Sequence, residues 1–133
     1  MTNEELIKKA ESVINFKKIE DSSMGEVGSA LITDKGNVYT GVCIDTDSGM
    51  GFCAEHNAIG SMITAKEYLV KKIVAVWKDE RGDIAIIPPC GRCREFMKQV
   101  NPENLKTEVI LDKDKTVKLK DLLPYHDWWK KIS

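Results

Sequence analysis

The chain has 133 residues, a size typical of one compact domain, and we expect residues 1–133 to form a single unit. A hydrophobic fraction of 42% and a charged fraction of 31% exclude a disordered protein. Twenty basic residues against twenty-one acidic ones give a formal net charge of -1, which argues against a nucleic-acid-binding protein. Because no apolar run approaches the roughly 18 residues of a membrane span and the N-terminus is acidic, we expect a cytoplasmic protein without membrane contact.

The first half of the chain predicts two helices on either side of a hairpin. Thr2 and Glu5 form a capping-box pattern, and apolar residues at helical spacing follow it. We therefore predict a helix over residues 3–15. The apolar runs over 27–33 and 38–44 predict two strands joined by a turn. A polar loop then leads to a helix over residues 54–66.

The second half of the chain alternates strands with one further helix. The run over 73–77 is almost unbroken in apolar residues, which is typical of a buried strand. The remaining expected elements are a strand over 84–87, a helix from Cys90 to about Val100, and strands over 107–111 and 116–119. Helices and strands in this order predict an α/β fold with one mixed sheet and helices on both faces.

Four cysteines are the unusual part of the composition: Cys43, Cys53, Cys90 and Cys93. Disulfides are not expected, since thiols stay reduced in the cytosol and a domain of this length can bury an adequate core. The two-residue gap between Cys90 and Cys93 suits metal binding and dithiol redox chemistry equally. This motif alone leaves both interpretations open.

The segment Cys53-Ala54-Glu55 resolves the choice in favour of a metal. Together with Pro89-Cys90-Gly91-Arg92-Cys93 it matches the three-cysteine form of the zinc deaminase pattern. A hydrolytic zinc ion needs three protein ligands and a fourth position open to water. Glu55 is not an expected ligand, and a carboxylate beside such a water can move its proton.

The four cysteines also allow two alternatives to a catalytic zinc site. In the first, all four cysteines hold zinc in a closed structural site, which makes the chain a non-catalytic binding module and leaves Glu55 without a role. In the second, Cys90 and Cys93 form a redox pair, which leaves Cys53 without a role. Three thiolates around one zinc ion also carry a net negative charge, and Arg92 and Arg94 are placed to offset it.

These motifs make the chain resemble the short cytidine deaminases, and blasticidin S deaminases of similar length in particular. The family's apolar strand is matched by residues 27–31, and its C-terminal signature by residues 122–124. The resemblance implies a three-layer α/β/α sandwich around a five-stranded mixed sheet, with one zinc ion per subunit. It also implies a homotetramer with shared active sites and hydrolytic deamination at C4 of a cytosine nucleoside.

The resemblance also implies a role for individual residues. Cys53, Cys90 and Cys93 bind zinc, while Glu55 protonates N3 of the ring and relays protons. The backbones of Ala54 and Pro89 contact the base, and Trp128 of the aromatic tail covers the active site of a neighbouring subunit.

Departures from the family pattern affect the sugar end of the site. The segment Cys43-Ile44-Asp45 stands where cytidine deaminases usually carry Asn-x-Glu, whose side chains bind the ribose hydroxyls. We therefore expect Cys43 and Asp45 to face the substrate. Gly25 and Glu26 replace an aromatic residue, and His56 replaces an arginine that bonds to the thiolates. The expected substrates are cytidine, deoxycytidine or blasticidin S, with another amino-heterocycle as the alternative, and the near-neutral charge favours a free small molecule over a polynucleotide.

Overall fold

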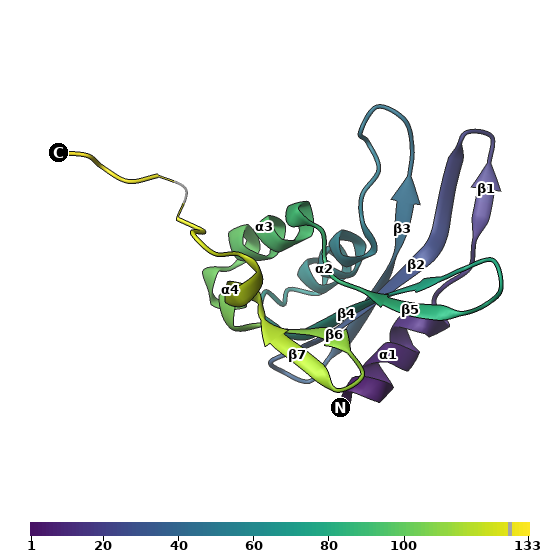
Figure 1. Cartoon of the computed structure of the whole chain (residues 1–133), viewed down its shortest axis with the longest axis horizontal. Coiled ribbons are helices and arrows are strands. Elements are labelled where there is room, and N and C mark those ends of the chain that lie inside the picture. Colours follow the sequence, from purple (N-terminus) through teal and green to yellow (C-terminus); the bar gives the residue numbers. More distant parts are fainter. Residues whose placement is uncertain (128) are drawn as a thin grey trace.

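The computed structural model describes residues 1–127 and 129–133. Its strands are β1 (Lys17–Ile19), β2 (Ser22–Thr33), β3 (Val38–Asp45), β4 (Val70–Lys78), β5 (Ile84–Ile87), β6 (Glu108–Asp112) and β7 (Lys115–Lys118). Its helices are α1 (Asn3–Ser12), α2 (Ala54–Thr64), α3 (Gly91–Val100), the 3-10 helix η1 (Pro102–Lys106) and α4 (Leu119–Leu122). Figure 1 shows these helices arranged around one twisted sheet.

The sheet is mixed, as predicted, but it has seven strands and not five. Its order is β1-β2-β4-β6-β7, with β3 paired to β2 and β5 paired to β4. Among the described residues, β4 and β6 pair in parallel and the other strand pairs are antiparallel. The number five came from the family resemblance; the apolar runs predicted six strands, and β1 is the strand that they missed. β1 has three residues, all exposed, and therefore shows no apolar alternation.

Two apolar clusters, one on each face of the sheet, confirm the three-layer arrangement. Alternate residues along a strand point to opposite faces, so neighbouring positions of β2 and β4 enter different clusters. Leu31 and Ile73 pack with α2 and α3, whereas Ala30 and Val74 pack with α1. Helices therefore cover both faces of the sheet (Figure 1).

The ends of several elements differ from the prediction. The capping box of Thr2 and Glu5 is present, but α1 ends at Ser12 and not at residue 15. β2 begins at Ser22, five residues before the predicted strand, because it continues through an irregular stretch. The short helices η1 and α4 were not predicted. None of the helices in the described ranges is long and apolar enough to cross a membrane.

Candidate active site

Three cysteine thiols meet where two helices begin. Cys53 is the N-cap residue of α2, Cys90 is the N-cap residue of α3, and Cys93 lies in the first turn of α3. The sulfur atoms of Cys53 and Cys90 are 3.5 Å apart, and those of Cys90 and Cys93 are 3.6 Å apart. Tetrahedral zinc, with Zn–S bonds of about 2.3 Å, places its sulfur ligands about 3.8 Å apart. The donor set and its spacing therefore fit zinc.

The electrostatics of these thiols also favour a metal ion. Burial raises the pKa of Cys53 to about 11 and raises that of Cys93 as well. Burial acts in the same direction on Cys90, but the backbone amides of Cys93 and Arg92, with the neighbouring thiols, bring its pKa below the ordinary value. Three thiolates in this space therefore require a cation among them.

Glu55 stands beside the thiol cluster without belonging to it. It lies in the first turn of α2 and is 4% exposed. Burial raises the pKa of its carboxyl group. The metal-binding cluster contains the three cysteines alone, and in the described part of the chain no other side chain hydrogen-bonds Glu55. A buried carboxyl group of this kind is suited to accept and release a proton near neutral pH.

One cavity of about 420 Å³ brings most of the predicted site residues together. Those that line it are Cys43, Asp45, Cys53, Ala54, Glu55, Cys90 and Arg92. Pro89 is buried and lines a smaller space together with Glu55. Trp128 lies outside the described residues. The cavity therefore joins the predicted metal site to the two residues that were expected to face the substrate.

His56 contacts the thiol cluster through Cys93. Its Nδ1 atom lies 3.3 Å from the sulfur of Cys93, and its ring stacks on Phe96 with centroids 4.1 Å apart and planes inclined by 10°. Burial, and then the charge of Arg92, lower the pKa of His56. The Arg92 guanidinium donates a hydrogen bond of 3.2 Å to the carbonyl of Gly51. Its hydrogen bond is therefore to the loop before α2 and not to a thiol.

Arg94, expected beside the thiolates, bonds to backbone carbonyls instead, and Glu26 was not among the expected site residues. The Arg94 side chain donates hydrogen bonds to the carbonyls of Pro89, at 2.7 Å, and Leu122, at 3.1 Å. It thereby connects the segment before α3 to α4. Glu26 lines the cavity from β2. The only sequence signal for Glu26 was its place where an aromatic residue is usual.

Comparison with known proteins agrees with this geometry. The family model for the cytidine and deoxycytidylate deaminase zinc-binding region matches residues 1–108. The chain therefore belongs to this family, whose cofactor is zinc.

Individual relatives carry two names. A probable cytidine deaminase of Dictyostelium discoideum is 32% identical over 99 residues, covering 72% of this chain and 65% of that protein. The blasticidin-S deaminase of Bacillus cereus is 35% identical over 82 residues, covering 58% of this chain and 59% of that protein. The chain thus matches less than two thirds of the length of these curated relatives.

The solved structures extend the similarity over nearly the whole fold. The crystal structure of cytidine deaminase from Burkholderia pseudomallei is 28% identical, with a TM-score of 0.72. The match covers 94% of this chain and 98% of that chain. The arrangement of the sheet and its helices is therefore that of a cytidine deaminase.

Proposed function

We propose that this protein is a zinc-dependent hydrolase that removes the C4 amino group of a cytosine nucleoside or of a cytosine-nucleoside antibiotic. Water and the cytosine compound are consumed, and the uracil compound and ammonia are released. One observation carries the proposal: a buried carboxyl group, Glu55, shares a cavity with Cys53 and Cys90, two members of a three-thiol cluster whose spacing fits zinc. Family membership of residues 1–108 supports the same reaction.

The thiols of Cys53, Cys90 and Cys93 would hold the zinc ion, which would supply a Lewis acid that activates water. Glu55 takes up a proton from water and delivers it to N3 of the ring, which makes C4 more open to attack. It later carries a proton to the departing amino group, which leaves as ammonia. The raised pKa of Glu55 supports this relay, because a carboxyl group that both gains and loses a proton works best near the operating pH.

The backbone around the metal site holds the base in this proposal. The buried Ala54 and Pro89 offer main-chain groups beside Glu55, and Arg94 fixes the Pro89 carbonyl by a hydrogen bond of 2.7 Å. His56 keeps the Cys93 sulfur in place through its contact of 3.3 Å. Because these side chains are already in place before the substrate binds, the site needs less reorganisation during the reaction.

The proposed substrate is one of three compounds: cytidine, deoxycytidine or blasticidin S. The relatives named cytidine deaminase and blasticidin-S deaminase support this set. Cys43 and Asp45 line the cavity and face the part of the substrate beyond the base. Both differ from the Asn-x-Glu pattern of ribose-binding deaminases, which favours a substrate whose sugar differs from plain ribose.

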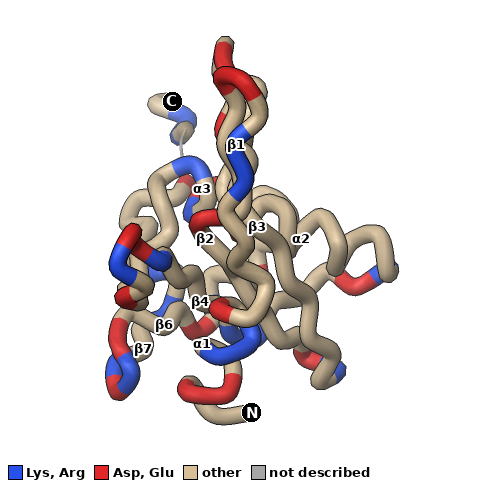
Figure 2. The backbone as a smooth tube through the Cα atoms, turned by 90° about the vertical axis from the view of Figure 1, so that its right-hand side faces the viewer, with Lys and Arg blue, Asp and Glu red and all other residues tan. Residues whose placement is uncertain are grey.

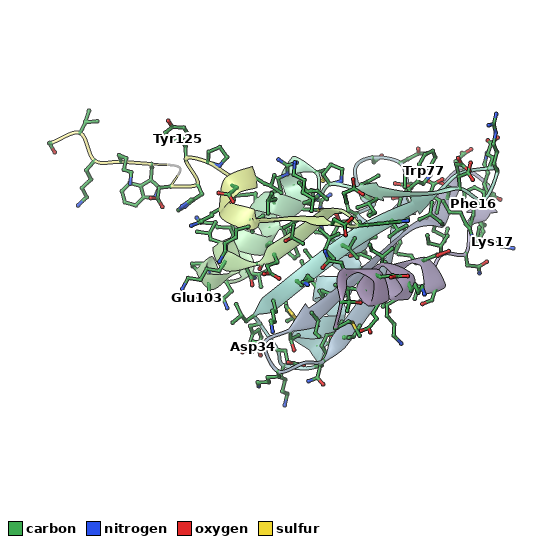
Figure 3. The ribbon with its side chains drawn as sticks, turned by 60° about the horizontal axis from the view of Figure 1, so that its bottom comes forward. Phe16, Lys17, Asp34, Trp77, Glu103 and Tyr125 are labelled. Atoms are coloured by element: carbon green, nitrogen blue, oxygen red, sulfur yellow. The ribbon has the colours of Figure 1, made fainter. Side chains whose placement is uncertain are left out.

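We further propose a cytoplasmic homotetramer in which residues 1–133 form one deaminase domain and neighbouring subunits complete each active site. Large apolar side chains left exposed support an assembly, among them Phe16 at 56%, Met50 at 78% and Tyr125 at 98%. Figure 3 places Phe16 and Tyr125 at opposite ends of the molecule, with Tyr125 on a segment that leaves the body of the fold. Light scattering of the purified protein tests the assembly: a monomer would contradict it.

A polynucleotide substrate is not part of the proposal. The formal net charge is -1, and Figure 2 shows that the basic strand β1 is followed directly by an acidic turn. A protein that grips a nucleic-acid backbone needs a continuous basic groove.

The proposal is tested by incubating the zinc-loaded protein with each of the three candidates. Deamination is followed by the loss of cytosine absorbance and by the ammonia released in the same sample. We expect at least one candidate to be converted, with ammonia and product in equal amounts. If all three remain intact, the substrate assignment is wrong, and other amino-heterocycles are tested next.

A further inference from the structure

A bulge in β2 presents Glu26 to the cavity. Between the pairs Met24–Ile44 and Gly28–Val42, β2 advances by four residues while β3 advances by two. The extra residues leave the regular ladder and turn toward the cavity. Gly25 makes this turn possible: its φ is 87°, and a Cβ atom there would lie 2.1 Å from the carbonyl oxygen of Asn15.

The bulge brings two carboxyl groups and one thiol together. Ligand atoms of Glu26, Cys43 and Asp45 all lie within 4.8 Å of one another. Cys43 is buried beneath the other two, and the backbone amides of the bulge partly offset the rise that burial causes in its thiol pKa. Glu26 is half-buried and Asp45 is exposed, so the carboxyl groups face the open side of the cavity.

The two carboxyl groups lack a basic partner. In the described parts of the chain, no Lys, Arg or His side chain forms an ion pair with Glu26 or Asp45. Arg92 lines the same cavity, but its guanidinium donates to the carbonyl of Gly51. Burial, and then the charge of Asp45, raise the pKa of Glu26, as expected for like charges held together without compensation.

This pair belongs to the catalytic cavity and not to a separate surface. Glu55 and two of the metal-binding cysteines line that cavity from α2 and α3, while Glu26, Cys43 and Asp45 line it from β2 and β3. A cytosine ring whose amino group lies at Glu55 would have its other substituent in the part of the cavity that Glu26 and Asp45 line.

We propose that Glu26 and Asp45 bind a positively charged amino or guanidino group on the sugar side of the substrate, and so select it over a neutral nucleoside. The inference rests on the proposed function, since it names the substrate class of the same site. A cation between the carboxylates removes their mutual repulsion and forms charge-assisted hydrogen bonds, which are about twice as strong as neutral ones. A ribose hydroxyl can donate a hydrogen bond to a carboxylate, but it is a neutral donor and does not remove the repulsion between the two carboxylates.

The test compares cytidine with two analogues that carry one amino group on the sugar, 3′-amino-3′-deoxycytidine and 5′-amino-5′-deoxycytidine. The wild-type protein is expected to show a kcat/KM at least about tenfold higher for one amino analogue than for cytidine. N-acetylation of that analogue, which removes the charge, should abolish the preference. Addition of salt should weaken the preference as well.

Three variants locate the effect. Glu26→Gln and Asp45→Asn should each raise KM for the amino analogue about tenfold while changing kcat little, and should raise KM for cytidine by a smaller factor, so that the preference for the amino analogue is lost. Glu80→Gln removes the same charge from an exposed residue outside the cavity and should change neither substrate. Thermal unfolding of each variant establishes that it is folded.

The outcomes separate this inference from the proposed function. If cytidine is deaminated and the amino analogues hold no advantage, or if their advantage survives in Glu26→Gln and Asp45→Asn, the inference is wrong while the deaminase assignment stands. If no nucleoside is deaminated, the proposed function is wrong. Calorimetric binding of the amino analogue and of cytidine to the wild-type and Glu26→Gln proteins then decides the inference: equal affinities overturn it.

Discussion

The close approach of α2 to β3 at Gly41 allows a quantitative prediction. A Cβ atom on Gly41 would lie 2.4 Å from the backbone nitrogen of Ala58, whereas ordinary contacts begin at 3.4 Å. The Gly41→Ala substitution therefore requires α2 to move away from β3 by about 1 Å. Because α2 carries Cys53 and Glu55 at its start, the displacement moves the proton relay relative to the metal site.

The expected cost follows from this displacement. Overpacking of a well-packed contact costs about 1–3 kcal/mol in the free energy of unfolding. A misplacement of about 1 Å at a catalytic group can lower the rate about 100-fold. We therefore expect Gly41→Ala to lower both the unfolding temperature and kcat/KM for the best substrate, measured by thermal unfolding and by ammonia release.

Gly60 provides the matched control. It lies in the same helix, and a Cβ atom there would meet nothing within 4 Å. Gly60→Ala should stabilise the protein by about 0.5–1 kcal/mol, because alanine favours a helix more than glycine does, and should leave kcat/KM unchanged. If Gly41→Ala matches Gly60→Ala in stability and turnover, the close packing of α2 on β3 does not position the site.

Four further variants test the metal site, a polar network and the core. Cys43→Ala should retain zinc in metal analysis while Cys90→Ala loses it; equal loss would instead indicate a structural four-cysteine site. Glu67 accepts hydrogen bonds from Tyr39 and Thr33, which lower its pKa. The ionised Glu67 should therefore stabilise the fold fully above the ordinary pKa of 4.5, and this stabilisation should disappear as the pH falls through the lower pKa of the folded state. In urea unfolding, Glu67→Gln should be less stable than wild type at neutral pH and equally stable in acid. A difference that does not change with pH would contradict the assignment. Leu31→Ala, at a fully buried position, should cost about 2–5 kcal/mol in the same assay, and a cost below about 1 kcal/mol would contradict its place in the core.

The sequence predicted those parts of the fold that leave a local pattern. Apolar runs located β2, β3 and β4, and the zinc motif located the starts of α2 and α3 at Cys53 and Cys90. β1 escaped prediction because the short Lys17–Ile19 segment is exposed and has no apolar face. Its pairing with β2 depends on a register that only the folded hairpin defines.

The candidate site also has one part that the sequence predicts and another part that it does not predict. The metal cluster could be predicted because zinc requires fixed ligand types at fixed spacing, and short sequence motifs show both the types and the spacing. The meeting of Glu26 with Asp45 could not be predicted, because it depends on the bulge at Gly25 and on the pairing of two strands. The contact of Arg94 with Leu122 joins segments that are 28 residues apart, and no local sequence pattern predicts it.

The most direct test of the account is the Glu55→Gln variant, which keeps the shape of the side chain and removes its capacity to carry a proton. Zinc content and deamination are measured together on wild-type and variant protein, with the best of the three candidate substrates. We expect the variant to retain one zinc per chain and to lose about 100- to 10,000-fold in kcat. A variant that retains both zinc and turnover would contradict the role of Glu55 and with it the proposed mechanism.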